Sequence, residues 1–265
     1  MSSCITVGVP FFAGSVLEQF QAAVNSILTQ TLRPDEVHLI QDGPIPEDLH
    51  KLVNSYVEKF PYVKHLIIEK NAGLAYAINY SLLNTMSTYY ARMDSDDIAH
   101  PQRLEKQVAY LDAHQDIDIL GTWALEFEKD PFTEQGFIRQ LPTEQTGIEA
   151  MFHYRNPFVH PAVVFRRSVF AKIGLYNIKF LDEDLELWSR AFQKKVKTAN
   201  LPEALLYYRF SGSVKRRAER VLYHAKARYQ FNTWSIKLNA LKLSALLLKI
   251  MPYKVQEWAY KNLRS

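Results

Sequence analysis

The chain has 265 residues, enough for one large α/β domain or two small ones, and its 48% hydrophobic and 23% charged content is ordinary for a globular protein. Its single cysteine, Cys4, excludes an intrachain disulfide and a cysteine-based metal site, which fits a reducing compartment. The net charge of +4 is uneven: residues 213–265 carry 12 basic and two acidic side chains, whereas residues 1–212 carry 20 basic and 26 acidic ones. We expect no signal peptide and no transmembrane segment, because no apolar run is long enough.

The first part of the chain alternates between predicted strands and helices. Apolar, β-rich segments predict strands at residues 4–12, 33–43, 63–70 and 89–94. Apolar residues at helical spacing predict helices at residues 15–30, 46–60 and 71–85. Ser15 and Glu18 have the spacing of a capping box, which predicts that the first helix is capped by Ser15. The alternating order predicts an α/β fold with a mostly parallel sheet flanked by helices.

The rest of the chain is less regular. The sequence predicts a helix at residues 102–114, a strand region at 116–129, a strand followed by a helix at 158–177, and a helix with one apolar face at 180–195. Residues 130–146 show little periodicity. From residue 221 onward the basic, aromatic-rich segment is expected to form helices.

Acidic residues gather where predicted strands end. Asp94, Asp96 and Asp97 follow one strand, and Asp42 ends another. Neighbouring carboxylates repel one another, so the cluster is either a solvated loop with a helix cap or a site for a divalent cation. Ligands of open α/β sheets bind beyond the carboxyl ends of the strands, which favours the binding site.

A second acidic cluster comprises Asp182, Glu183, Asp184 and Glu186. The helix dipole accounts for one or two carboxylates in a first helical turn better than for four. The first strand is not followed by Gly-x-Gly-x-x-Gly, and no Gly-Lys-Ser/Thr motif is present. A dinucleotide-binding domain and a P-loop nucleotidase are therefore not expected.

Six segments carry a family resemblance through their sequences and their order along the chain: VGVPFF, AVNSILTQTLRPDEVHLIQDGP, NAGLAYAIN, ARMDSDDIAHPQRLEKQ, NPFVHPAVVFRRSVF and DEDLELWSRA. Together they span roughly residues 4–212 and resemble the family-two glycosyltransferases. QDGP at residues 41–44 and KRR at residues 215–217 resemble the bacterial enzymes that build exopolysaccharide or lipopolysaccharide O-chains. The resemblance implies a GT-A (Rossmann-like) domain at residues 1–212 and a C-terminal helical extension, a basic amphipathic tail, at residues 213–265.

The resemblance also implies roles for individual residues. Asp184 would be the catalytic base of an inverting displacement, and Glu183 would orient the acceptor or support Asp184. Asp94 and Asp96 would hold Mn²⁺ or Mg²⁺ against the donor diphosphate. His160 would lie near the acceptor, with a buried structural histidine as the alternative. The remaining donor-binding residues would be Pro10, Asp42, Asn71, Gly73, Arg92, Lys215, Arg216 and Arg217, with Asp42 on the uracil or ribose.

Two further residues are expected to be structural: Trp188 would pack a helix, and Arg103 would position the acidic loop. The segment LLYYRFSGSVKRRAER departs from many relatives, because it lacks the metal-binding histidine that they carry after the last core strand. Ser211 or Ser213 would occupy that space. Either the metal has fewer protein ligands, or the basic residues 215–217 bind the diphosphate instead.

The resemblance favours transfer of galactose from UDP-galactose in a β-1,3 linkage to a glycan or an undecaprenyl-diphosphate-linked acceptor, in bacterial surface polysaccharide biosynthesis. UDP-glucose and UDP-N-acetylglucosamine are alternative donors. A sugar nucleotidyltransferase would need a glycine-rich basic loop after the first strand, which VPFFAGS does not provide. A non-catalytic nucleotide-sugar-binding protein would not need the complete set of Asp94, Asp96 and Asp184.

The tail is expected to lie on the inner face of the cytoplasmic membrane, which makes the protein cytoplasmic and peripheral. Packing on the catalytic domain or on another copy of the chain is the alternative. Nucleic acid is not expected as a partner, because the sequence contains no recognition motif.

Overall fold

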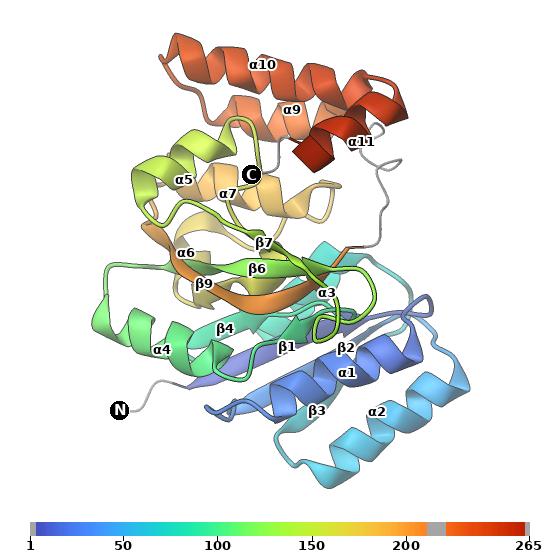
Figure 1. Cartoon of the computed structure of the whole chain (residues 1–265). Helices are drawn as coiled ribbons and strands as arrows, with labels where there is room; N and C mark the ends of the chain where they lie inside the picture. Colours follow the sequence, from blue (N-terminus) through green and yellow to red (C-terminus); the bar gives the residue numbers. More distant parts are fainter. Residues whose placement is uncertain (1–3, 211–220, 263–265) are drawn as a thin grey trace.

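A computed structural model describes residues 4–210 and 221–262 (Figure 1). The strands are β1 Ile5–Phe11, β2 Glu36–Asp42, β3 Val63–Ile68, β4 Tyr89–Arg92, β5 Ile98–Ala99, β6 Ile119–Phe127, β7 Phe137–Arg139, β8 Val164–Arg166 and β9 Thr198–Arg209. The helices are α1 Leu17–Leu28, α2 Glu47–Lys59, α3 Leu74–Leu83, α4 Arg103–Ala113, α5 Gln145–Phe152, α6 Val169–Ile173, α7 Glu183–Gln193, α9 Val221–Gln230, α10 Ile236–Ile250 and α11 Tyr253–Asn262. A short 3₁₀ helix, η1, spans His160–Ala162.

The first four strands form the parallel part of the sheet, in the order β3-β2-β1-β4. Every residue of β1 is buried, as expected of a strand covered on both faces by helices. Helices α1, α2 and α3 connect these strands and pack against them. The predicted alternation of strands and helices is therefore confirmed.

The sheet continues through β8, β6, β9 and β5 beyond β4, and β7 pairs with β6. Strand β8 runs antiparallel to β4, and β6 runs antiparallel to β8 but parallel to β9. Strand β5 has only two residues, and no sequence pattern predicted it. Its pairing of Ile98 with Tyr207 brings the segment after the acidic cluster against β9. This mixed part of the sheet therefore borders the acidic loop.

The predicted capping box at the start of α1 is wrong. The N-cap residue is Val16, and no side chain caps the helix. The Ser15 hydroxyl instead accepts a hydrogen bond from the backbone N–H of Phe12 at 3.1 Å. The loop after β1 satisfies the side chain of Ser15 locally, so this hydroxyl does not reach the first turn of α1.

Helix α4 supports the centre of the sheet with two buried polar side chains. Arg103 Nη2 donates to the carbonyl oxygen of Arg92 at 2.8 Å, directly before the acidic loop. Gln107 Nε2 donates to the carbonyl oxygens of Leu120 and Ala162. The expectation that Arg103 positions the acidic loop agrees with its contact to the backbone.

The described part of the tail is helical, as expected, and it packs on α7. Figure 1 shows α9 between α10 and the α7 layer, with α10 at the outer end of the molecule. The Phe231 ring stacks on the His153 ring at 5.5 Å, and His224 Nε2 lies 3.3 Å from Asp182 Oδ2. Among the residues described, no helix combines the length and apolar character needed to cross a membrane. The predicted boundary at residues 212 and 213 lies outside the described residues.

Candidate active site

The carboxyl ends of the parallel strands β1, β2 and β4 meet at one edge of the sheet. Asp42 is the last residue of β2, and Asp94 follows β4 by two residues. Ser15, in the loop after β1, has its Oγ 3.4 Å from the Oγ of Ser95 in the acidic loop. Pro10 is buried near the end of β1, opposite Ile40 of β2. The predicted residues of these three segments therefore share one edge.

Asp42 binds the turn that precedes α3. Its Oδ1 accepts a hydrogen bond from the N–H of Ala72 at 2.7 Å, and its Oδ2 accepts one from the N–H of Gly73 at 2.9 Å. Asn71 Nδ2 donates to the carbonyl oxygen of Asp42 at 3.1 Å. Gly73 has a φ of 87° and a ψ of 164°, a conformation that is essentially restricted to glycine. Three predicted donor-binding residues, Asp42, Asn71 and Gly73, thus form one hydrogen-bonded unit.

The acidic loop brings three carboxylates close together. Asp94, Asp96 and Asp97 each offer an oxygen within 4.8 Å of the other two. The backbone N–H of Arg209 donates to Asp97 Oδ1 at 2.7 Å, and Arg209 Nε donates to the carbonyl oxygen of Asp96 at 2.9 Å. Strand β9 therefore holds the loop in its bent form.

The electrostatics of this loop favour a bound cation. Burial, together with the charges of Asp94 and Asp96, raises the pKa of Asp97 well above its ordinary value. Burial and the charge of Asp94 raise the pKa of Asp96. Asp97 Oδ2 is buried and has no hydrogen-bond partner among the described residues. Carboxylate oxygens are the ligands that Mg²⁺ and Mn²⁺ prefer, so this donor set fits such an ion.

Arg92, the last residue of β4, pairs with the acidic loop. Its Nη2 is 2.5 Å from Asp94 Oδ1, and the residue is almost completely buried. Burial alone would lower the pKa of Arg92, but the charges of Asp94, Tyr176 and Asp97 and a hydrogen bond to Asp94 raise it overall. Burial raises the pKa of Asp184, and the charge of Arg92 is one of the effects that oppose this rise. Arg92 therefore interacts with both predicted halves of the site.

Asp184 lies in the first turn of α7. Its Oδ2 accepts a hydrogen bond from Asn156 Nδ2 at 2.5 Å, and its Oδ1 accepts one from the N–H of Leu185 at 2.7 Å. Burial raises the pKa of Asp184 above its ordinary value, although these two hydrogen bonds and Arg92 act in the opposite direction. A carboxylate with a raised pKa beside a binding edge has the properties of a general base.

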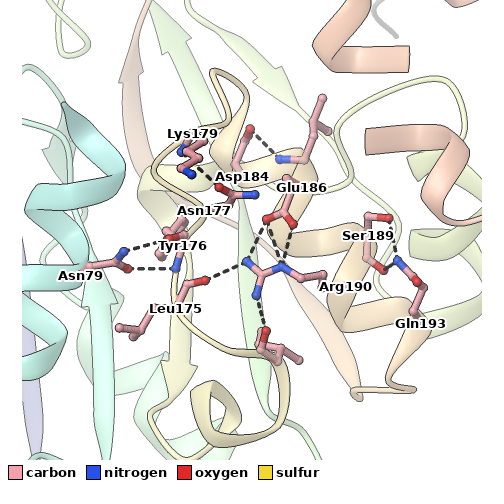
Figure 2. A network of polar contacts seen from close by, with 12 residues as sticks. Asn79, Leu175, Tyr176, Asn177, Lys179, Asp184, Glu186, Ser189, Arg190 and Gln193 are labelled. Carbon is pink, nitrogen blue, oxygen red and sulfur yellow. Dashed lines mark hydrogen bonds and ion pairs between the residues drawn. The ribbon is translucent and has the colours of Figure 1, made fainter. Parts of the chain in front are cut away.

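The loop before α7 is held by polar contacts, shown in Figure 2. Asn79 donates to the carbonyl oxygen of Tyr176 at 2.8 Å and accepts from its N–H at 2.9 Å. Arg190 pairs with Glu186 at 2.8 Å and donates to the carbonyl oxygen of Leu175 at 2.8 Å. The pairing with Arg190 gives Glu186 a structural role, so Glu186 and Asp184 differ in role although they belong to the same acidic cluster.

His160 is buried. Its Nε2 lies 2.9 Å from the hydroxyl of Tyr176, and its ring meets Trp188 edge-on. Burial lowers the pKa of His160 well below its ordinary value, so the imidazole is neutral. Trp188 is fully buried, which confirms its predicted packing role. Glu183 begins α7 next to Asp184, whereas residues 211–217, with Ser211, Ser213, Lys215, Arg216 and Arg217, lie outside the described residues.

Comparison with known proteins identifies the family. Residues 6–174 match the family described as Glycosyl transferase family 2. The amylovoran biosynthesis glycosyltransferase AmsE of Erwinia amylovora is 31% identical over 256 residues, which cover 94% of each chain. The chain belongs to glycosyl transferase family 2.

This family-two glycosyltransferase has a second relative in Escherichia coli, which is named UDP-Gal:alpha-D-GlcNAc-diphosphoundecaprenol beta-1,3-galactosyltransferase. The two chains are 30% identical over 247 residues, which cover 91% of this chain and 89% of the relative. Among solved structures, mannosyltransferase PcManGT from Pyrobaculum calidifontis, in complex with GDP-Man and Mn²⁺, has a TM-score of 0.68 at 13% identity, over 99% of this chain and 76% of that one. The GT-A fold expected from the sequence is confirmed.

Two contacts of the family-two glycosyltransferase were missed by reasoning from its sequence. Arg209 lies 112 positions from Asp97, and nothing in the sequence pairs them. Asn156 opens the segment NPFVHPAVV, which carried the resemblance, but its contact with Asp184 spans 28 positions. A search for polar residues within the quoted segments could have found Asn156, whereas Arg209 required the pairing of β5 with β9.

Proposed function

We propose that the protein is an inverting, metal-assisted galactosyltransferase of bacterial surface polysaccharide biosynthesis. It would transfer galactose from UDP-galactose in a β-1,3 linkage to a glycan or an undecaprenyl-diphosphate-linked acceptor. The observation that carries the proposal is the position of Arg92, which pairs with Asp94 of the acidic loop and acts on the pKa of Asp184. A donor-diphosphate site and a proton acceptor would then lie on either side of one guanidinium group.

In this reaction Asp184 removes the proton from an acceptor hydroxyl as that oxygen attacks the anomeric carbon of the donor sugar. The bond from the anomeric carbon to the diphosphate breaks, the electron pair leaves with the nucleoside diphosphate, and the proton remains on Asp184. Attack from the face opposite the leaving group inverts the configuration. Asn156 and the N–H of Leu185 orient the carboxylate of Asp184 through both of its oxygens.

Asp94 and Asp96 would hold Mn²⁺ or Mg²⁺, with Asp97 as a third carboxylate nearby. The cation would neutralise negative charge that develops on the leaving diphosphate. The Pyrobaculum mannosyltransferase supports this assignment, because that protein of similar fold binds Mn²⁺ together with a nucleotide sugar, GDP-Man.

The donor-binding part of the site would be the unit of Asp42, Asn71 and Gly73, with Pro10 beside it and Lys215, Arg216 and Arg217 on the diphosphate. His160 and Glu183 would act on the acceptor side. The choice of galactose and of the β-1,3 linkage rests on the name of the Escherichia coli relative. UDP-glucose and UDP-N-acetylglucosamine are the alternative donors to compare with UDP-galactose. We propose that residues 1–212 carry this chemistry and that residues 213–265 form a separate tail.

The test is product formation by the purified full chain. UDP-, GDP- and dTDP-sugars are offered with Mn²⁺ and a synthetic lipid-diphosphate-linked N-acetylglucosamine acceptor, and the linkage is determined by NMR. We expect a β-1,3 galactoside to form from UDP-galactose and from no other donor. The rate of its formation should fall at least about 100-fold in Asp184→Asn and in Asp96→Ala. Asp116→Asn makes the same acid-to-amide change at an exposed position and should retain full activity. Transfer from another donor would correct the substrate, and full activity in Asp184→Asn would overturn the assigned base.

A further inference from the structure

A row of apolar side chains runs along one side of α10 and faces solvent. Ile236, Leu243, Leu247 and Ile250 follow one another at intervals of seven, four and three residues, which places them on one face of a helix. Their exposed fractions range from 44% to 87%. Trp234, just before α10, and Trp258, on α11, are also exposed. We call these six residues the outer row: Trp234, Ile236, Leu243, Leu247, Ile250 and Trp258.

The other side of α10 is already occupied by α9. Lys242 and Leu246 are buried, and Lys242 Nζ donates to the carbonyl oxygen of Arg228 at 3.0 Å. It also lies 3.4 Å from the carbonyl oxygen of Phe231, at the end of α9. A buried cation at the carboxyl end of a helix is favoured by the helix dipole and fixes the two helices together. The outer row is therefore a second apolar face, separate from the buried one that packs on α9. Figure 1 shows that α10 itself lies at the outer end of the molecule.

The charges near this face are predominantly positive. Lys237 and Lys254 are exposed on α10 and α11, respectively. Between residues 221 and 262 the sequence contains one acidic residue, Glu257. A second copy of the chain would bring the same positive charge against this face, and like charges across an interface are unfavourable. An anionic surface is complementary to it.

We propose that the outer face of α10 and α11 binds an anionic lipid surface. The outer row would enter the headgroup region of the bilayer, and Lys237 and Lys254 would lie beside the lipid phosphates. Exposed aliphatic side chains with lysines at their edges are typical of helices that lie in a membrane interface, and tryptophan is favoured at that depth. Each lysine close to such a surface contributes about 1 kcal/mol.

Helix α9 connects this surface to the site. It packs on α7 through buried Ala227 and Arg228, and the burial of Arg228 lowers its pKa to about 10, against the effect of Asp182 and Asp184. Binding through the outer row would hold α7, and with it Asp184, at a constant distance from the bilayer. This consequence rests on the proposed function, because it matters for an acceptor that is itself carried by a lipid. Membrane binding itself does not depend on it.

The experiment is sedimentation of the purified full chain with vesicles that contain neither donor nor acceptor. Vesicles of phosphatidylcholine are compared with vesicles in which part of the lipid is phosphatidylglycerol. We expect binding to the anionic vesicles, weakened by added salt. The partition coefficient should fall by about tenfold or more in the double variant Leu243→Ser, Ile250→Ser. In the double variant Lys237→Gln, Lys254→Gln, the partition coefficient should fall by about fivefold for each of the two lysines removed.

Matched controls change exposed residues elsewhere. Leu83→Ser with Met86→Ser removes two exposed apolar side chains from another surface, and Lys51→Gln with Lys59→Gln removes two exposed lysines from α2. Both controls should bind vesicles like the wild type. The proposal would be overturned if Leu243→Ser, Ile250→Ser bound anionic vesicles as well as the wild type. It would also be overturned if the wild type, without lipid, formed a dimer at higher concentration and this variant stayed monomeric. Donor hydrolysis should be unchanged in all four variants, which separates this result from a failure of the proposed function.

Discussion

The guanidinium of Arg92 pairs with the carboxylate of Asp94 at 2.5 Å, and its Nε and Nη1 have no hydrogen-bond partner among the described residues. One buried cation thus faces the three carboxylates of the acidic loop. It compensates part of their charge and leaves two donor groups available inside the site.

Replacing Arg92 by methionine should therefore destabilise the protein through these carboxylates. We expect Arg92→Met to lower the free energy of unfolding by about 3 kcal/mol, because an uncompensated charge remains buried. Added Mn²⁺ should restore more stability to this variant than it adds to the wild type, since the more negative loop binds the cation more tightly. Urea denaturation with and without Mn²⁺ measures both effects. Arg33→Met, at an exposed position, is the control. An equal gain from Mn²⁺ in both proteins would show that the charge of Arg92 does not affect cation binding, and no gain in either protein would show that the loop does not bind Mn²⁺.

Asp42 uses both carboxylate oxygens to accept backbone hydrogen bonds, which an amide cannot do. In Asp42→Asn one N–H of the turn at residues 72–73 would face the NH₂ group of the new side chain. We expect the free energy of unfolding to fall by about 1–3 kcal/mol and KM for the donor to rise, because the turn loses its anchor. Chemical denaturation and donor titration measure the two quantities. A rise in KM without any loss of stability would mean that Asp42 contacts the donor and does not anchor the turn.

The pH dependence of activity should report on Asp184 and its partner Asn156. Burial raises the pKa of Asp184, and the hydrogen bond from Asn156 opposes this shift. A base acts in its deprotonated form, so removing that hydrogen bond raises the pKa and moves the acid limb of kcat/KM to higher pH. We expect a shift of about one pH unit in Asn156→Leu, with little change on the alkaline side. Asn54→Leu, on the exposed side of α2, should keep the wild-type profile. A uniform loss of activity at every pH would indicate a structural role for Asn156.

Lys242 should hold α9 and α10 together. Replacing it by methionine removes its hydrogen bonds to the end of α9, at a cost of about 2 kcal/mol. Hydrogen–deuterium exchange should then accelerate in α9 and α10 and stay unchanged in β1 to β4. The exposed Lys237→Met provides the comparison. Equal protection of α9 and α10 in both variants would show that apolar packing alone joins these helices.

Much of the fold could be predicted because its elements are encoded locally. Predominantly apolar segments such as residues 5–11 and helical spacing such as that of residues 74–83 identify strands and helices without tertiary information. The capping box at Ser15 failed because two residues at the right spacing do not determine whether the chain has already turned into a helix. Strand β5 was missed because two residues are too few to show any period.

The sequence by itself determined the alternating order of the elements, the family, and the presence of acidic groups at the ends of strands. These features depend on side chains close to one another along the chain, such as Asp94, Asp96 and Asp97. Only the tertiary structure decided how the groups are used. Arg209 reaches the acidic loop across 112 positions, and Asn156 reaches Asp184 across 28. Such contacts depend on strand pairing and helix packing, which are set by the burial of the whole core and leave no local pattern at either residue.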